Sequence, residues 1–391
     1  MGDFAVSSNS ARACKRLAAV SLVVTACFVC SWLLTSTTGQ PEEATLSVAI
    51  ASTPSLERIR PTIDRASLTF TILLHGKPLE QGHIKVQLIA PPRMKVLSTG
   101  FPWVEGTSLL IFDSEFSDGA FTLQYVFPIR GIYTFDLEIT SVPEGAAFPP
   151  ISLRKTVRIS ENPVVARNAW LLIGGLLIFG GIIGAIFARS AAAREKLLSC
   201  AIVGPLLLYC GALGPVNTVA AHGGHTEGAS YRAPERQVIR GDDGWELEIH
   251  SSPMPAIVGH LVQLAIWLRK DGEVFPGMMQ VTTTVTSLEE GQTVVETNIL
   301  ARQGHTAQSL QLYDGTPHTI AVTVRPVGSD ARGWLPPTAV LNVDVVALPP
   351  PFAVQLKMLA MLVGVLVVGM VVGFFAPRIY KEQTSDGPGV G

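Results

Sequence analysis

Six of the eight histidines in this 391-residue chain fall in a single stretch. They are His222, His225, His250, His260, His305 and His318. Imidazole nitrogen is the commonest protein ligand for metals such as copper and zinc. Met254 lies in the same stretch, and its thioether is a soft donor that suits Cu(I). These residue types predict transition-metal binding, with copper preferred over zinc.

The first two of these histidines form the sequence His222-Gly-Gly-His225, directly after an apolar segment. Because the two flexible glycines must be ordered when a metal binds, the pair alone predicts a weak site. Cleavage of the chain before His222 would let its amino group and imidazole chelate one copper ion together. Without cleavage, residues 222–230 are expected to form a solvated linker.

The other four histidines are expected near the ends of β-strands. His250 ends one expected strand, His260 precedes the next and His318 opens the last. His305 is expected on a connecting loop. Strand ends can converge at one end of a sandwich, so these residues could share a metal ion. The alternative for His318 is a polar residue at a strand edge that pairs with Asp314 across a turn.

Four apolar segments indicate a membrane protein. Mean hydropathy is +0.37 and only 15% of the residues are charged, which is typical of membrane proteins. A helix needs about 20 apolar residues to cross a bilayer, and segments 169–188 and 353–376 supply them. Segment 197–216 is interrupted by Pro205, and segment 17–35 is either an uncleaved anchor or a signal peptide. Three to four transmembrane helices are therefore expected.

Two of these segments have processing alternatives. Residues 24–27 (Val-Thr-Ala-Cys) resemble a lipoprotein cleavage site, although the chain stays apolar after them. Segment 197–216 lies between residues 194–196 (Arg-Glu-Lys) and 219–221 (Val-Ala-Ala), which is the layout of a secretory signal peptide. A transmembrane helix is the favoured interpretation of 197–216, because internal segments seldom reach signal peptidase.

The basic residues orient these segments. Lysine and arginine accumulate on the cytoplasmic side of a membrane protein, and here they occur in residues 1–16, 189–196 and 377–391. One arrangement places all three regions in the cytoplasm and both large regions, 43–160 and 231–349, outside. The sequence therefore predicts a multi-pass protein of the bacterial inner membrane, with both large domains on the periplasmic side.

Small residues in the two long spans predict close helix packing. Gly180 and Gly184 lie four residues apart in one span, and Gly369 and Gly373 lie four apart in the other. This spacing lets two helix backbones approach closely in the lipid bilayer. Packing within the chain and a homodimer would both use these faces.

Both large regions are expected to be all-β. They contain short alternating or apolar strands between Gly, Pro, Asp and Asn residues, without a long 3.6-residue pattern. Each has about the size of a seven-stranded sandwich. The expected fold class is a membrane-anchored all-β protein with two extracytoplasmic immunoglobulin-like β-sandwiches, 43–160 and 231–349, and three to four transmembrane helices.

The two regions also match each other, which indicates an internal repeat. Residues 48–54 align with 247–253, residues 70–74 with 264–268, and residues 133–139 with 318–324. His250 then corresponds to Ala51, and His318 corresponds to Tyr133. Since the first copy keeps its strands without these imidazoles, the fold does not require them. His250 and His318 are therefore the histidines most worth testing.

Four short stretches within residues 245–326 carry a resemblance to a known family. They are residues 249–253 (Ile-His-Ser-Ser-Pro), 258–260 (Val-Gly-His), 268–272 (Leu-Arg-Lys-Asp-Gly) and 313–318 (Tyr-Asp-Gly-Thr-Pro-His). They resemble the small periplasmic immunoglobulin-like domains of the YtkA-like and CopC-like type. The resemblance implies an exported domain found beside proteins that handle copper and other metals. CopC-like proteins bind Cu(II) through a mature N-terminal histidine, which here would require cleavage before His222.

Catalysis and nucleic-acid binding are not expected. The chain contains no Gly-rich phosphate loop, no Gly-x-Ser-x-Gly elbow and no His-Glu-x-x-His sequence. Its net charge of -2 gives no basic surface for nucleic acid. Two functions remain. The first is binding or delivery of a transition metal, copper above all, by the second region. The second is a non-catalytic scaffold or accessory subunit of a membrane complex, with another membrane or periplasmic protein as partner and no metal.

Overall fold

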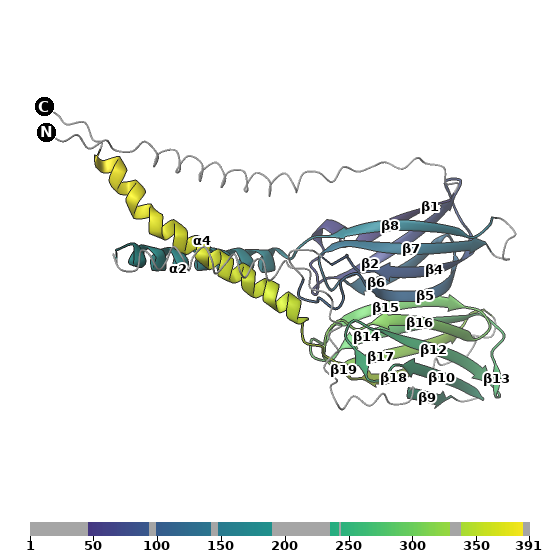
Figure 1. The fold of residues 1–391 in the computed structure, drawn as a ribbon. Coiled ribbons are helices and arrows are strands. Elements are labelled where there is room, and N and C mark those ends of the chain that lie inside the picture. Colours follow the sequence, from purple (N-terminus) through teal and green to yellow (C-terminus); the bar gives the residue numbers. More distant parts are fainter. Residues whose placement is uncertain are drawn as a thin grey trace, which may run out of the picture. The chain divides into compact units, whose positions relative to one another are not determined.

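The computed structural model describes residues 46–93, 99–141, 148–189, 235–241, 244–328 and 338–385, with side chains up to residue 376. This part of the chain consists of mostly antiparallel β-sheet and two long apolar helices (Figure 1). The all-β expectation is therefore confirmed. The expected segments 17–35, 197–216 and 222–230, with His222 and His225, lie outside the described residues.

The two sandwiches use the same order of strands. The first contains β1 (Leu46–Thr53), the 3-10 helix η1 (Leu56–Arg58), β2 (Arg65–Leu74), β3 (Lys77–Pro78), β4 (Gln81–Ile89), β5 (Ser108–Ser117), β6 (Ala120–Val126), β7 (Gly131–Ser141) and β8 (Ile151–Ile159). The second contains β9 (Glu235–Arg240), β10 (Trp245–Ser252), β11 (Ala256–Ile257), β12 (Leu261–Lys270), β13 (Glu273–Val274), β14 (Met279–Ser287), β15 (Thr293–Ala301), β16 (His305–Gln311), β17 (His318–Pro326), β18 (Thr338–Val343) and β19 (Val345–Val346).

Alternating apolar residues explain why these segments are strands around a core. In β2 the side chains of Leu68, Phe70 and Ile72 are fully buried, while the residues between them are only partly buried. Successive side chains of a strand point to opposite faces, so this period of two places one face against the interior. The same alternation runs through β4, β12, β14 and β17.

The two sandwiches are joined edge to edge by backbone pairing. β6 pairs with β15, and β5 pairs with β16. One continuous sheet therefore runs β1-β2-β6-β15-β14-β17-β18, and the other runs β9-β10-β12-β16-β5-β4-β7-β8. Among the described strands, one bridge, between Leu300 and Glu115, connects the two sheets. Side chains also cross the junction, as in the hydrogen bond of 2.7 Å from Gln292 Nε2 to the Ile63 carbonyl oxygen.

The pairing registers confirm the internal repeat. Leu74 pairs with Lys77 across the turn after β2, and Lys270 pairs with Glu273 across the equivalent turn after β12. The register shifts at the same place in both copies, after Leu88 in β4 and after Val285 in β14. Exchanging every strand for its counterpart converts one joined sheet into the other. The two copies are therefore related by a pseudo-two-fold axis, and β9 and the short strands β11 and β19 have no counterpart among the described strands of the first copy.

The registers also correct one part of the sequence alignment. Ile50 pairs with Phe70 in the first copy, and the equivalent Ile249 pairs with Ile266 in the second. Phe70 therefore corresponds to Ile266, two residues beyond the expected Leu264. The alignment was misleading because a shift of two residues keeps every side chain on the same face of a strand.

One long apolar helix follows each sandwich in the chain. These helices are α2 (Pro163–Arg189) and α4 (Phe352–Ser385), and the segments Pro163–Arg189 and Phe352–Ala376 are long and apolar enough to cross a membrane. The Asn162 side-chain oxygen accepts a hydrogen bond of 3.0 Å from the Val164 backbone N–H, which caps the start of α2. In the described part of the chain these are the two expected spans, 169–188 and 353–376, each somewhat longer than expected.

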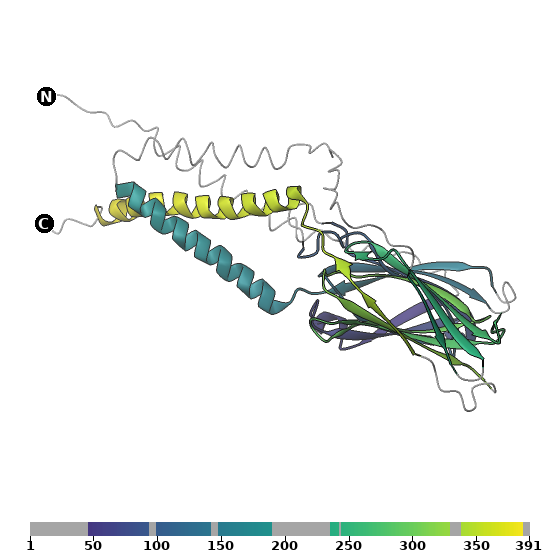
Figure 2. The ribbon, with the colours of Figure 1, turned by 90° about the horizontal axis from the view of Figure 1, so that it is seen from below.

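Glycines allow α2 and α4 to cross closely (Figure 2). A Cβ atom added to Gly184 would overlap the carbonyl group of Met370, and one added to Gly373 would overlap the carbonyl group of Gly181. The faces of Gly180, Gly184, Gly369 and Gly373 are thus used within the chain. A homodimer through these faces, one of the two expected uses, would require α2 and α4 to separate.

Candidate functional site

The expected histidine ligands lie on different layers of the second sandwich. His250 lies in β10 on the outer face of its sheet, with a side chain that is 38% exposed, whereas His318 in β17 faces the interior and is 1% exposed. His260 lies in the turn before β12, and Met254 is buried. In the described ranges, no group of three or more His, Cys, Asp or Glu side chains is arranged to hold a metal ion. The described residues therefore do not bring His250, His260 and His318 together as a three-ligand group, and metal binding stays a prediction.

His318 takes the place of a structural tyrosine. Its counterpart, Tyr133, donates a hydrogen bond of 2.6 Å to the Ile129 carbonyl oxygen and accepts one of 3.0 Å from the Ile129 backbone N–H. His318 Nδ1 lies 2.7 Å from the Thr316 carbonyl oxygen, and its Nε2 lies 3.5 Å from Asp314 Oδ1. In both copies the side chain near the start of this strand fixes the preceding turn. Of the two expectations for His318, the structure contains the pairing with Asp314.

The second sandwich carries a polar and aromatic group on its outer face, here called the outer-face cluster. Its members are Arg236, Glu248, His250, Trp267, Arg269 and His305. Glu248 Oε1 lies 2.7 Å from Arg236 Nε and 2.7 Å from His250 Nε2, and its Oε2 lies 3.2 Å from Arg269 Nε. One carboxylate therefore holds three nitrogen-bearing side chains in place.

Trp267 forms the aromatic half of the cluster. The centroid of its ring lies 4.8 Å from that of His250 and 5.0 Å from that of His305. His305 opens β16 and does not lie on a loop as expected, because the turn before it is short and its strand pairs with β12 from Trp267 onward. The two imidazoles thus flank one indole ring and do not face each other.

The strand registers explain how four strands bring these residues together. Glu248 pairs with Trp267, and Trp267 pairs with His305, so these three residues form one row across β10, β12 and β16. His250 pairs with Arg236 of β9 in the next row on the same face. Every second residue of a strand points to the same side, so the spacing Glu248–His250 fixes both side chains on the outer face.

The cluster contains more positively than negatively charged side chains. Glu248 is only 5% exposed, and the hydrogen bond from His250, followed by the charges of Arg236 and Arg269, lowers the pKa of its carboxyl group. Two guanidinium groups therefore surround one carboxylate. Its two arginines and one glutamate give the cluster a net positive charge.

The first sandwich lacks this cluster although it has the same strands. The positions of Glu248, His250, Trp267, Arg269 and His305 are held there by Ala49, Ala51, Thr71, Leu73 and Ala120. Small or neutral residues therefore suffice for the fold at these positions. Sequence reasoning found His250 and His305 but missed Glu248, Trp267 and the two arginines. The signal available was the spacing of two between Glu246, Glu248 and His250, which places three polar side chains on one face.

The contribution of the buried Glu248 carboxylate to stability can be tested by changing the pH. Glu248→Gln keeps the shape of the side chain and removes its charge. Because the folded-state pKa of Glu248 is lowered below the model-peptide value of 4.5, its charge contributes stability that is complete above that pH and is lost as the pH falls through the folded pKa. The variant is therefore expected to be less stable than the wild type at neutral pH, with a difference that shrinks below about pH 4.5.

Chemical denaturation of the full chain at a series of pH values measures this difference. Gln263→Ala in β12, at an exposed uncharged side chain, is the control and is expected to change stability by the same amount at every pH. A stability difference between wild type and Glu248→Gln that is constant from neutral to acid pH would show that the carboxylate is not held in this way.

Comparison with known proteins leaves the chain without a family. No family model matches the chain, and no curated protein matches it in sequence. Among solved structures, a conjugative transposon lipoprotein from Bacteroides eggerthii is 12% identical, with 26% of this chain and 96% of that chain covered and a TM-score of 0.20. Salmonella alpha-2-macroglobulin is 8% identical over 80% of this chain, which spans 15% of that protein, with a TM-score of 0.22. Latent PorU from Porphyromonas gingivalis is 9% identical, with 80% of this chain and 35% of PorU covered and a TM-score of 0.24. These similarities assign neither a family nor a function.

Proposed function

We propose that the protein is a non-catalytic accessory subunit of a bacterial membrane complex, and that the outer-face cluster is its docking surface for a partner protein. The observation that carries this proposal is the contrast between the two copies. The second sandwich places Glu248, Trp267 and Arg269 where the first has Ala49, Thr71 and Leu73. The first sandwich folds with small or neutral residues at these positions, so a carboxylate that gathers two arginines and a histidine there favours a role in recognition.

The chemistry of the cluster fits a partner with an acidic surface. Tryptophan and arginine are enriched among the residues that dominate binding energy in protein interfaces. The Arg236 side chain is 60% exposed and the Arg269 side chain is 34% exposed, and each has further N–H donors beyond the one given to Glu248. Their excess positive charge would attract carboxylates and would set the orientation of the partner.

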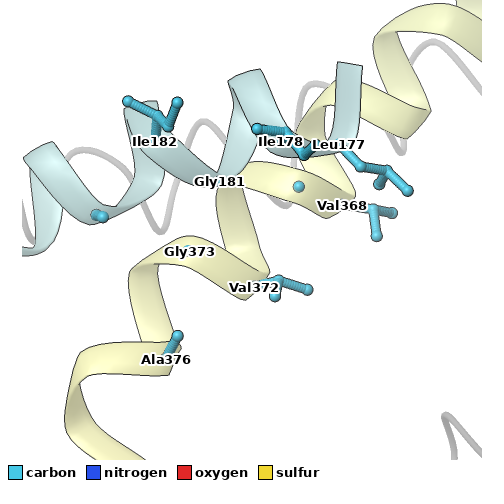
Figure 3. Close-up of a pocket in the computed structure, with 10 residues that line it drawn as sticks. Leu177, Ile178, Gly181, Ile182, Val368, Val372, Gly373 and Ala376 are labelled. Carbon is cyan, nitrogen blue, oxygen red and sulfur yellow. The ribbon is translucent and has the colours of Figure 1, made fainter. Parts of the chain in front are cut away.

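The helices support a membrane location for this subunit. Apolar side chains cover the outside of α2, where Trp170 is 71% exposed and both Leu171 and Ile178 are 68% exposed. Lipid covers such a surface at far lower cost than water does. An apolar groove of about 570 Å³ lies between α2 and α4, with Ile178, Ile182 and Val372 on its wall (Figure 3). Together with the basic residues of 189–196 and 377–391, this supports an inner-membrane anchor with both immunoglobulin-like sandwiches in the periplasm.

Site-specific photo-crosslinking of the full chain in its native membrane tests the docking surface. A photoreactive amino acid at His305 is expected to give a discrete adduct of higher mass. The same amino acid at Ala120, the equivalent position in the first sandwich, is the matched control and should give none. Arg236→Glu, which reverses one exposed charge, is expected to reduce the His305 adduct about tenfold. Equal adducts from His305 and Ala120 would exclude the cluster as the specific surface.

Metal binding by the second sandwich is the second candidate function. It is supported by His250 and His305, two partly exposed imidazoles that the first sandwich replaces with Ala51 and Ala120. The full chain in detergent can be titrated with Cu(I), Cu(II) and Zn(II). If a metal binds with a Kd below about 1 µM and His250→Ala with His305→Ala abolishes it, metal binding replaces docking as the function of this face.

A further inference from the structure

β9 is the longest strand of the second copy that has no counterpart among the described strands of the first. It adds to the free edge of β10, where residues Glu246 to Ser251 pair with Arg240 to Glu235 in antiparallel register. The counterpart of β10 is β1, which among the described strands pairs with β2 alone. β1 and β9 therefore lie at opposite ends of the joined sheets (Figure 1), and among the described strands the edge of β10 is covered whereas that of β1 is not.

The charges of β9 complement those of β10. Arg240 of β9 pairs with Glu246, and Arg236 pairs with His250 and contacts Glu248. Basic side chains of the added strand thus meet acidic side chains of β10 on the outer face. Opposite charges on neighbouring strands stabilise their pairing, so the chemistry of an edge indicates the chemistry of its partner strand.

The equivalent edge of β1 is uncharged along its whole length. The positions of Glu246, Glu248 and His250 are held by Ser47, Ala49 and Ala51, all three exposed. Natural proteins protect free sheet edges with charged residues, proline or bulges, and the strand Leu46–Thr53 has none of these. In contrast β8, the edge of the other sheet of this sandwich, carries Arg154, Lys155 and Arg158.

We propose that the edge of β1 receives an extended, uncharged segment of a partner protein, added antiparallel along Ser47 to Ser52 as β9 is added along β10. Backbone hydrogen bonds would supply the affinity, since every second residue of an edge strand directs its N–H and C=O groups away from the sheet. The small side chains of Ser47, Ala49 and Ala51 leave room for larger neutral side chains on the added strand. This surface is separate from the outer-face cluster and does not depend on it.

Hydrogen–deuterium exchange of the full chain tests the open edge. In lipid nanodiscs that contain only this protein, amides of β1 are expected to exchange about tenfold faster than those of β10. In native membranes, which contain the partner, the exchange of β1 should slow to that of β10.

Slow exchange already in single-copy nanodiscs would mean that residues before Leu46 cover the edge. Slowing only with two copies per disc would assign the edge to a second copy, and either result overturns the proposal. Fast exchange in both settings would show that nothing binds there.

Paired substitutions test the chemistry of the added strand. Ala49→Glu with Ala51→Glu gives β1 a charge like that of β10, and it should remove the protection seen in native membranes. Ala49→Val with Ala51→Val keeps the edge neutral and should preserve the protection from exchange. Protection that survives the two glutamates would overturn an uncharged partner segment. The photo-crosslinking yield at His305 should be the same in both pairs, so this result and the test of the outer-face cluster remain independent.

Discussion

Gly184→Val is expected to separate α2 from α4 and to destabilise the helix pair by about 3 kcal/mol. The Cβ atom of the valine would overlap the carbonyl group of Met370, and the obstacle is backbone that cannot rotate away. In a bilayer the hydrophobic effect does not hold helices together, so close van der Waals contact between backbones is the main attraction. A side chain that pushes the backbones apart removes most of it.

Alkylation of a cysteine at Gly181 measures the separation. Gly181 lies at the crossing, where an added Cβ atom would be 3.7 Å from the Gly369 carbonyl oxygen, so a cysteine fits there without overlap. In detergent micelles, with the native cysteines replaced by serine, Gly184→Val should raise the alkylation rate about tenfold. Gly174→Val in the same helix is the matched control, because a side chain there meets no atom within 4 Å. Equal rates in the two variants would mean that the glycine faces do not hold the helices.

The sequence predicts the strands and the two helices because these features leave a periodic signal, but it does not predict the edge-to-edge joining of the two sandwiches. Alternation along strands such as Leu68–Ile72 predicts sandwich strands, and long apolar runs predict α2 and α4. The internal match also predicts that His318 replaces Tyr133, and the registers confirm it. These signals are local, so a single sequence contains them.

The site could be predicted only in part, because its members meet through long-range pairing. Arg236, Glu248, Trp267 and His305 come from four strands, and their rows depend on registers that the sequence does not state. Counting histidines also groups residues that the structure separates, because it treats His250 and His318 alike although His318 faces the core. What separates a buried histidine from an exposed one is its phase within the strand, and a shift of one residue reverses it.

Gln308→Leu is expected to destabilise the second sandwich by about 2 kcal/mol, although leucine is the more apolar side chain. Gln308 lies in the core at 2% exposure, where its Oε1 accepts a hydrogen bond of 3.0 Å from Thr297 Oγ1 and its Nε2 donates to Thr283 Oγ1. Leucine would leave both buried hydroxyls without this partner, and desolvated polar groups without hydrogen bonds are costly. Denaturant unfolding of the full chain, followed by tryptophan fluorescence, measures the loss.

The first sandwich indicates how the loss should be recovered. It has Val86, Phe112 and Leu123 where the second has Thr283, Thr297 and Gln308, so an all-apolar set fits the same strands. Thr283→Val with Thr297→Val and Gln308→Leu removes the whole network and should unfold within about 1 kcal/mol of the wild type. Gln280→Leu, at a half-buried glutamine that bonds Asn298, is the control and should change stability by less than about 0.5 kcal/mol. If the triple variant loses the sum of its single losses, the three side chains act separately and the network does not exist as a unit.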